Sequence, residues 1–339
     1  MESVDEVVQA AYSLALERPF THLIAATEKS IAAAGYVRAV LGLPGLHADA
    51  SLSMTHKRVM KDKLRSAGVP VAKAAQAHGV EQVLEKIVEF DAPVVIKPVF
   101  GSLSKDTFFI DSRVDFELRH ATGEFDSLLK TAILVEARIH VVREYHCEGI
   151  VRNGAIDDIA VSRYFQPPVI MTKTFNARYF IDQQSDVAES IRRLHEQVRV
   201  ALDLRAGVTH LEVLDDGREL WVGEVAMRPG GLGIGYSWQL AYGIDPWDEF
   251  IGTQLGEEST LRARERGRFG STQLPASSLI RDRALSHPAV VEVFTPEQSL
   301  TGCNEVHFQV QDSASAQQVI RELHRIGGRT AALLRPNPA

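Results

Sequence analysis

The segment WVGEVAMRPGG, residues 221–231, combines groups that could act on a charged substrate. Alternate side chains of an extended strand point to the same face, so Glu224, Ala226 and Arg228 share one face of the strand that this segment predicts. A proline and two glycines then end the strand. An isolated acid and guanidinium in this arrangement are typical of an ion pair at a sheet surface. A functional site requires further groups around them.

A second carboxylate, Glu212, lies in the predicted strand VTHLEVL. A three-residue turn over residues 215–217 would set Glu212 opposite Leu220 and place it on the same face as Glu224. Two such carboxylates repel each other unless a cation lies between them, and carboxylate oxygens suit magnesium that also binds substrate phosphates. The sequence therefore predicts a magnesium site. Since about four residues at roughly 3.3 Å each separate the two acids, the sheet must coil or bulge at Gly223.

Lys97 lies within the apolar strand VVIKP. Burial of an ammonium group is costly unless an anion neutralises it, and phosphate is a suitable anion. The turn FGSLSKD follows, and its amides and the hydroxyls of Ser102 and Ser104 could surround phosphate oxygens. A plain hairpin turn has the same composition, so this turn alone does not decide between the two interpretations.

Two further acids follow in the sequence. Glu136 lies at the end of the predicted strand LVEARI, before backbone positions that could hydrogen-bond the edge of a base. Glu144 could accept a hydrogen bond from a ribose, although a lone glutamate is more often a solvated surface residue. Upstream, the predicted helix that Gly68 ends places Lys57 and Lys61 on one face.

The patterns of hydrophobic residues predict alternating helices and strands. The first segment reads as a helix to Leu16, a strand over 21–27 and a helix over 29–42, and Ser53 or Thr55 is expected to cap the next helix. Asn153 and Gly154 predict a tight hairpin. The aperiodic stretch over residues 166–184 is long enough to suggest a lid. The remaining predictions are strands within 92–111, 131–139, 208–214 and 219–228, a helix over 186–204, and helical residues over 236–256 with a break at 243–246.

These elements divide the chain into three parts. Residues 1–51 form a short α/β segment, residues 52–260 carry the candidate site, and residues 261–339 form a small α+β unit. The predicted fold class is α+β.

Composition limits the classes of function. The 339 residues are 45% hydrophobic and 24% charged, and the formal net charge is −7. This charge and a pI of about 6.0 argue against a nucleic-acid-binding protein. The sequence shows neither a secretory signal nor an apolar run of about 18 residues, which argues against a membrane partner. Two distant cysteines, Cys147 and Cys303, fit a reducing compartment. We therefore expect a cytoplasmic protein that acts on small molecules.

Taken in order, these pieces resemble the ATP-grasp superfamily, in particular its carboxylate–amine ligases of the amino-acid ligase (dipeptide synthetase-like) type. The matching segments are HKRVMK, VIKPVFGSLS, VEARI, THLEV and GEVAMRPGG, which together span roughly residues 53–248. The resemblance implies an ATP-grasp fold with an abbreviated N-terminal segment. It also implies an enzyme that uses ATP and Mg²⁺ to activate a small-molecule carboxylate as an acyl phosphate and join it to an amine, releasing ADP and phosphate. A homodimer is compatible with it.

The resemblance also implies roles for the candidate residues. Lysines contact the ATP phosphates, serines belong to the loop that covers the phosphates, a strand end and the backbone after it bind adenine, and two glutamates hold magnesium. An arginine acts in catalysis with a lysine, and with two glycines it holds the acyl substrate. The implied phosphate lysines are Lys57 and Lys97, and the serines of the loop are Ser102 and Ser104. The implied adenine site is Glu136 and the backbone of Ala137 to Ile139, with Glu144 at the ribose, and the magnesium ligands are Glu212 and Glu224. The arginine is Arg228, which would act in catalysis with Lys97 and hold the acyl substrate with Gly230 and Gly231.

Two departures keep alternatives open. Ala226 stands where the family motif has a metal-binding asparagine, and Glu144 lies one residue farther from Glu136 than the motif places it. The first departure would suit a nucleotide-binding subunit without turnover. The acceptor could also be a thiol or a carrier-protein arm, and the substrate could be a purine precursor.

Overall fold

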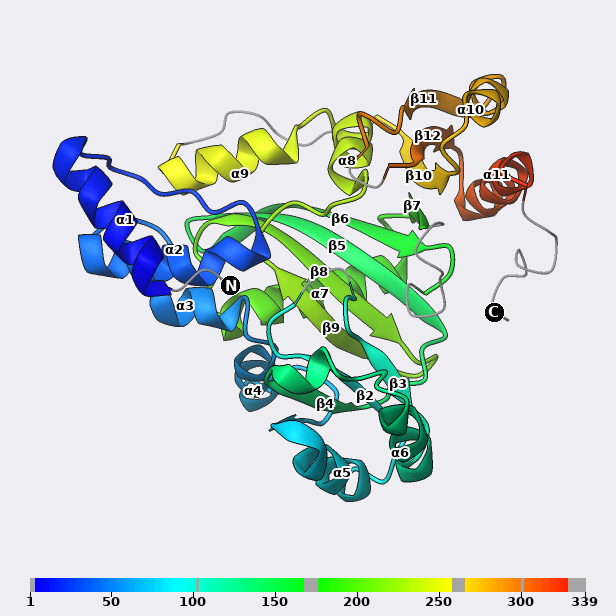
Figure 1. Cartoon of the computed structure of the whole chain (residues 1–339). Coiled ribbons are helices and arrows are strands. Elements are labelled where there is room, and N and C mark those ends of the chain that lie inside the picture. The colour runs from blue at the N-terminus through cyan, green and yellow to red at the C-terminus, as the bar shows by residue number, and fades with distance from the viewer. Residues whose placement is uncertain (1–3, 102–103, 168–175, 258–265, 300–301, 329–339) are drawn as a thin grey trace. The chain divides into compact units, whose positions relative to one another are not determined.

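The computed structural model describes residues 4–101, 104–167, 176–257, 266–299 and 302–328 (Figure 1). The chain forms two compact units. The first comprises residues 1–140, 197–204 and 221–227, and the second comprises residues 141–196, 205–220 and 228–339. Within the described ranges, no helix is both long and apolar enough to cross a membrane.

The first unit begins with three helices, α1 (Val4–Glu17), α2 (Glu28–Leu41) and α3 (Ala48–Ser53). The strand predicted over residues 21–27 is absent, because that segment is extended without a strand partner. The buried side chain of Arg38 holds it instead: Nη2 donates to the carbonyl of Leu23 at 2.6 Å, and Nη1 donates to the carbonyl of Leu46 at 3.1 Å. A side chain thus replaces the sheet that the sequence predicted.

Helix α4 (Lys57–Ser66) begins two residues after Thr55, the nearer of the two predicted caps. The cap is His56, whose Nδ1 accepts a hydrogen bond from the amide of Val59 at 3.3 Å. The hydroxyls of Ser53 and Thr55 are not available, because they donate to carbonyls of the preceding helix turn. The prediction of Ser53 or Thr55 as the cap was therefore wrong, although the helix itself is confirmed.

A four-stranded antiparallel sheet follows, in the order β1 (Ala74–Ala77), β4 (Ile133–Ala137), β2 (Val94–Pro98) and β3 (Phe108–Ile110). Helices α5 (Gly79–Glu89) and α6 (Arg113–Ala121) and the short 3-10 helix η1 (Leu128–Lys130) cover one face of it (Figure 1). Val94, Ile96, Ile133 and Val135 point into that core. Because strand residues alternate between faces, the intervening charged residues of β2 and β4 point to the other face.

The second unit contains an antiparallel sheet in the order β11-β12-β10-β7-β6-β5-β8. The predicted hairpin at Asn153 and Gly154 is confirmed, since both residues have positive φ values of 50° and 74° between β5 and β6. The strands are β5 (Arg143–Arg152), β6 (Ala155–Tyr164), β7 (Ala177–Phe180), β8 (Gly207–Asp215), β10 (Arg268–Leu274), β11 (Val290–Phe294) and β12 (Asn304–Val310).

Helices α8 (Ile234–Tyr242) and α9 (Pro246–Leu255) cover part of one face of this sheet, where Trp238 and Phe250 pack against Ile150 and Phe180. The break predicted between these two helices is confirmed. Helix α7 (Asp186–Ala201) begins in the second unit and ends in the first. The remaining helices are α10 (Ser278–Leu285) and α11 (Ser313–Ile326).

The turn between β8 and β9 (Leu220–Ala226) differs from the prediction. The amide of Asp216 donates to the carbonyl of Glu219 at 3.3 Å, and Gly217 has a positive φ of 87°. A two-residue loop therefore replaces the three-residue turn over 215–217. The register derived from that turn, with Glu212 opposite Leu220, does not hold.

The stretch interpreted as a lid contains strand β7, which pairs with β6 and β10. The absence of regular structure predicted for residues 177–180 was therefore wrong. Residues 168–175 of the same stretch lie outside the described residues.

Gly35 permits the close contact between α2 and α3. A Cβ atom at Gly35 would lie 2.1 Å from Ser51 Oγ and 2.4 Å from Ser51 Cβ. We expect Gly35→Ala to lower the free energy of unfolding by about 1–3 kcal/mol through overpacking. Urea unfolding would measure this change.

Gly252 provides a matched control, because a Cβ there would find its nearest neighbour, Glu257 Oε2, at 3.6 Å. Gly252→Ala should stabilise α9 by about 0.5–1 kcal/mol, since alanine loses less backbone entropy. A change of the same sign and size in both variants would contradict the steric argument, whereas Ser51→Gly should relieve the cost of Gly35→Ala.

Candidate functional site

Three lysines and two glutamates of the first unit form a network that we call the lysine–carboxylate cluster. Its charged groups are largely buried: the side chains of Lys61 and Glu136 are 3% and 7% exposed. Helix α4 supplies two lysines at a spacing of four residues, which places both on its buried face. The members are Lys57, Lys61, Lys97, Glu136 and Glu224.

Lys57 connects α4 to strand β9. Its Nζ lies 2.6 Å from Glu224 Oε1 and donates to the carbonyl of Gly101 at 2.6 Å. Gly101 immediately precedes Ser102, which lies outside the described residues. Lys57 thus links one predicted metal ligand to the start of the predicted phosphate loop.

Glu136 is held between two ammonium groups. Lys61 Nζ lies 2.7 Å from Glu136 Oε1, and Lys97 Nζ lies 2.6 Å from Glu136 Oε2. Burial by itself raises the pKa of Glu136, but the charges and hydrogen bonds of the two lysines outweigh it and lower the pKa to about 2. Burial lowers the pKa of Lys61, and Glu136 partly offsets that effect. Lys97 therefore does have an anionic partner, as predicted, but in this structure the partner is a carboxylate.

The lysine–carboxylate cluster carries one more positive charge than negative charge when all five groups are ionised. A polyanion could replace the carboxylates as the partner of the lysines, because ammonium groups bind phosphate oxygens readily. The arrangement is therefore suited to binding an anion of high charge.

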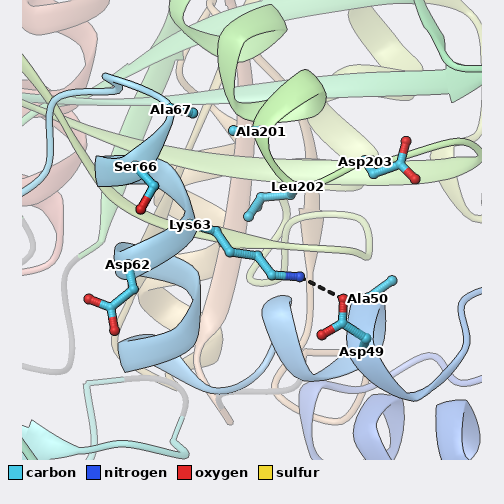
Figure 2. A pocket seen from close by; sticks show the side chains of 9 residues that line it. All are labelled: Asp49, Ala50, Asp62, Lys63, Ser66, Ala67, Ala201, Leu202 and Asp203. Carbon is cyan, nitrogen blue, oxygen red and sulfur yellow. Dashed lines mark hydrogen bonds and ion pairs between the residues drawn. The ribbon is translucent and has the colours of Figure 1, made fainter.

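The opposite side of α4 borders a hollow of about 540 Å³ lined by Lys63, Asp62 and Ser66 together with Asp49 and Asp203 (Figure 2). Lys63 Nζ lies 2.8 Å from Asp49 Oδ2 there. At about 100° per residue, Lys63 and Ser66 point roughly 120–180° away from Lys57 and Lys61, so the hollow lies away from the two buried lysines. Its carboxylates outnumber its single lysine, which makes it unsuited to phosphate. We assign the candidate site to the lysine–carboxylate cluster rather than to this hollow.

The other residues predicted around a nucleotide are in varied environments. Ser104 has a left-handed backbone with φ of 52°, as expected of a turn. The amides of Ala137 and Arg138 donate to the carbonyls of Lys73 and Pro93. An amide that donates to a base from this backbone segment would thus be that of Ile139. Glu144 is buried on β5, so the alternative that it is a solvated surface residue was wrong.

The sheet of the second unit has a face that changes from apolar to polar along its strands. At one end Ile150, Phe180 and Phe269 pack under α8 and α9. At the other end the same face carries buried polar side chains, which we call the buried polar face. It comprises Glu144, His146, Glu148, Ser162, Tyr164, Arg178, His210, Ser271, Glu305 and His307.

Glu148 organises the centre of the buried polar face. Its Oε1 lies 3.0 Å from His146 Nδ1 and 2.6 Å from His210 Nδ1, and its Oε2 accepts from the amide of Gly230 at 3.2 Å. Although burial raises the pKa of Glu148, the two histidines lower it below the usual range. Burial lowers the pKa of His146 to about 4. Burial also opposes the charge of His210, but Glu148 raises its pKa to about 10.

Arg228, Gly230 and Gly231 follow β9 and lie in the second unit. Gly230 packs tightly, since a Cβ there would lie 3.0 Å from His210 Nδ1. Arg228 Nη1 donates to the carbonyl of Pro229 at 2.8 Å. The predicted acyl-substrate segment is therefore anchored to the buried polar face through Gly230.

The two predicted magnesium ligands belong to different units. Glu212 is on β8 in the second unit, where its side chain is 37% exposed and its Oε1 lies 3.7 Å from His210 Nε2. Glu224 is on β9 in the first unit, 26% exposed and bound to Lys57.

Sequence reasoning missed most residues of the buried polar face and one lysine of the lysine–carboxylate cluster. Lys61 was placed on the right helix face but was not chosen, although its spacing of four residues from Lys57 was the available signal. Glu148 and His146 were not selected, because alternation in the hairpin indicates only a shared face. Their importance appears only when β8 brings His210 beside them.

Glu136 generates a prediction of pH-dependent stability. Because its folded pKa of about 2 lies below the ordinary value of 4.5, Glu136 contributes stability that is present above pH 4.5 and lost as the pH falls toward 2. Glu136→Gln leaves Lys61 buried without a counter-charge, so the free energy of unfolding at pH 7 should fall by about 3 kcal/mol. The difference from the wild type should shrink between pH 4.5 and 2, as measured by urea unfolding across that range.

Glu124→Gln is the control, because Glu124 pairs with Arg119 at the surface of the same unit. Its effect at pH 7 should stay within about 1 kcal/mol. Equal effects of the two substitutions would show that Glu136 is not the partner on which the buried lysines depend.

Comparison with known proteins shows which proteins the chain resembles. No family model matches the sequence. The chain is 28% identical over 301 residues to an L-arginine-specific L-amino acid ligase of Bacillus subtilis, a match that covers 87% of this chain and 70% of that protein. It is 26% identical over 265 residues to an uncharacterised protein of Sinorhizobium fredii, with coverage of 76% and 52%.

Solved structures show the same fold. The L-amino acid ligase from Bacillus licheniformis matches with a TM-score of 0.74 and 18% identity, covering 96% of this chain and 84% of that chain. The ADP complex of an N5-carboxyaminoimidazole ribonucleotide synthetase matches with a TM-score of 0.75 and 14% identity, covering 96% and 85%. The resemblance indicated by the sequence is thus confirmed: the chain has the fold of the ATP-grasp carboxylate–amine ligases and is similar in sequence to an L-amino acid ligase.

Proposed function

We propose that this chain is an ATP-dependent ligase that activates a carboxylate, in particular that of an amino acid, as an acyl phosphate and joins it to an amine with release of ADP and phosphate. The observation that carries the proposal is the lysine–carboxylate cluster. It gathers three ammonium groups in one unit of a chain with an ATP-grasp fold. The sequence similarity to an L-amino acid ligase favours an amino acid as substrate.

In this proposal the carboxylates of the cluster hold the lysines ready for the nucleotide. Lys57 and Lys97 exchange Glu224 and Glu136 for ATP phosphate oxygens, while Lys61 stays on Glu136 and keeps its carboxylate ionised. Ser102 and Ser104 cover the phosphates, the strand end at Glu136 and the backbone of Ala137 to Ile139 contact the base, and Glu144 contacts the ribose.

The residues proposed for magnesium have suitable chemistry. Glu212 and Glu224 each offer a partly exposed carboxylate, and oxygen ligands of this kind suit Mg²⁺ held together with substrate phosphates. When bound, the ion would neutralise charge on the terminal phosphates. Ala226 offers no ligand atom, so the two glutamates carry the protein's share of the coordination.

The chemistry then follows from positioning and charge. An oxygen of the substrate carboxylate attacks the γ-phosphorus of ATP, the bond to the β-phosphate oxygen breaks, and ADP leaves. The lysines stabilise the charge that develops on the phosphate oxygens, and Arg228 with Gly230 and Gly231 holds the acyl group. The amine attacks the acyl carbon, phosphate leaves, and the amine loses a proton. No side-chain nucleophile is needed.

The finer assignments follow the same proposal. Residues 52–260 would hold the nucleotide and the acyl group, with residues 1–51 and 261–339 as the segments that flank them. A cytoplasmic enzyme fits the two free cysteines, Cys147 and Cys303. A homodimer is compatible with this role, and neither nucleic acid nor membrane is required. There are two alternatives: the acceptor is a thiol or a carrier-protein arm, or the chain is a nucleotide-binding subunit without turnover. The test below separates both from the proposed ligase.

The proposal predicts the products of ATP cleavage. Amino acids are screened in pairs with ATP and magnesium, and the spent nucleotide is separated by chromatography. We expect ADP and phosphate, released only when both a carboxylate and an amine are present. AMP and pyrophosphate would rule out attack at the γ-phosphorus and with it the proposed mechanism. Carboxylate-dependent cleavage that requires a thiol would establish the alternative acceptor.

Glu224→Gln tests the same reaction from the protein side. Turnover should fall by roughly two orders of magnitude while the fold persists, because a charge beside the phosphates is lost at constant shape. Glu219→Gln, in the exposed turn before β9, is the matched control and should retain full activity.

Lys97→Met tests nucleotide binding. The substitution keeps the apolar stem and removes the ammonium, while Glu136 retains Lys61 as its partner. ATP affinity measured by calorimetry should fall roughly tenfold or more. Lys63→Met, on the opposite side of α4 (Figure 2), should leave the affinity unchanged. Equal affinity in the two variants would remove Lys97 from the site.

A further inference from the structure

Arg178 on β7 is a buried cation whose terminal nitrogens have no hydrogen-bonded partner in the part of the chain that the structure describes. The residue is 2% exposed, and its Nε donates to Ser271 Oγ at 3.1 Å. Among the described residues, no group forms a hydrogen bond with Nη1 or Nη2. Burial of a guanidinium in this state is costly, so a buried arginine of this kind normally has an anion as its partner.

The carboxylates that face Arg178 are already engaged. Glu148 and Glu305 both interact with the guanidinium through charge, but neither forms a hydrogen bond with it. Glu148 is bound by His146, His210 and the amide of Gly230. Glu305 Oε1 lies 2.9 Å from His307 Nε2. The two free nitrogens of Arg178 are therefore available to an anion from outside the chain.

Arg178 also lies beside the segment proposed to hold the acyl substrate. Gly230 donates to Glu148, and a Cβ at Gly233 would lie 2.4 Å from Glu305 Oε1. The residues from Gly230 to Gly233 thus contact both carboxylates that face the guanidinium. An anion on Arg178 would consequently be close to the reacting groups and would belong to a substrate.

A second unsatisfied atom, His146 Nε2, shares the buried polar face. The His146 ring packs at 5.0 Å from the ring of Tyr164, and Tyr164 pairs with Arg178 across β6 and β7. Because the opposite ring nitrogen, Nδ1, donates to the carboxylate of Glu148, Nε2 is left as an acceptor. A two-pronged donor and a nearby acceptor match the carboxylate and the amino group of an amino acid.

We propose that Arg178, with His146 beside it, binds an amino acid substrate through a carboxylate other than the one that is activated. This inference rests on the proposed ligase function and specifies its substrate class. The carboxylate comes either from the α-carboxyl group of the acceptor amino acid or from an acidic side chain of the donor. In both cases Arg178 donates through Nη1 and Nη2.

The experiment compares ligands that differ only in the carboxylate. Calorimetry in the presence of ADP measures binding of L-amino acids against their carboxamides, and of L-glutamate against L-glutamine. The wild type should bind at least one carboxylate form more tightly than its amide, and Arg178→Met should abolish that preference with a roughly 10- to 100-fold loss of affinity. A preference for α-carboxylates that Arg178→Met abolishes identifies the acceptor as the source, and a preference for glutamate over glutamine that it abolishes identifies a donor side chain.

Stability separates this role from a structural one. Arg178→Met should melt no lower than the wild type without ligand, because it removes an unpaired buried charge. Arg152→Met is the matched control on β5, since Arg152 pairs with Asp157 and Glu249 and its loss should lower the melting temperature. Equal destabilisation by the two substitutions, or an unchanged carboxylate preference in Arg178→Met, would overturn the inference. Carboxylate preference without any ATP cleavage would support the inference while contradicting the proposed ligase function.

Discussion

The lysine–carboxylate cluster depends on one constraint: Lys61 is buried and must have an anion beside it. Glu136 meets that requirement with one oxygen and holds Lys97 with the other. The strand alternation that sends Val135 into the apolar core sends Glu136 to the opposite face, toward α4. A single carboxylate thus couples the helix to the sheet and keeps Lys97 in place. Because an unpaired buried charge is costly, alternative arrangements that separate Lys61 from Glu136 are disfavoured.

Buried charge in the second unit also has partners, but there the central charge is a carboxylate. There Glu148 is surrounded by donors, and its charge stabilises the protonated form of His210. The apolar half of the sheet face is covered by α8 and α9, whereas the polar half is covered in part by the residues from Gly230 to Gly233. Glycines are needed at this point because a Cβ at Gly230 or Gly233 would meet His210 or Glu305. The backbone can therefore lie against the charged side chains of His210 and Glu305 only because Gly230 and Gly233 lack a Cβ atom.

Much of the fold could be predicted from local patterns, because amphipathic helices and the Asn153–Gly154 hairpin depend on neighbouring residues. The segment over 21–27 could not, since the distant side chain of Arg38 satisfies its carbonyl group. The cap of α4 was missed for a similar reason, as Ser53 and Thr55 bond backward. Single site residues such as Lys97 could be recognised in the sequence as charges in apolar strands. Their partners could not be predicted, because strand pairing determines which residues lie beside them.

The two units handle buried charge in opposite ways, which bears on their roles. In the lysine–carboxylate cluster the three ammonium groups each have a carboxylate within 2.7 Å, so a phosphate must displace an existing partner. Displacement keeps the unliganded state stable and limits the net gain from each contact, because every new ion pair replaces an old one. Among the described residues, Arg178 Nη1 and Nη2 have no hydrogen-bonded partner to displace, so an anion that reaches them forms new hydrogen bonds without breaking old ones. Affinity for a small substrate could therefore rest on one arginine, while the nucleotide needs several lysines.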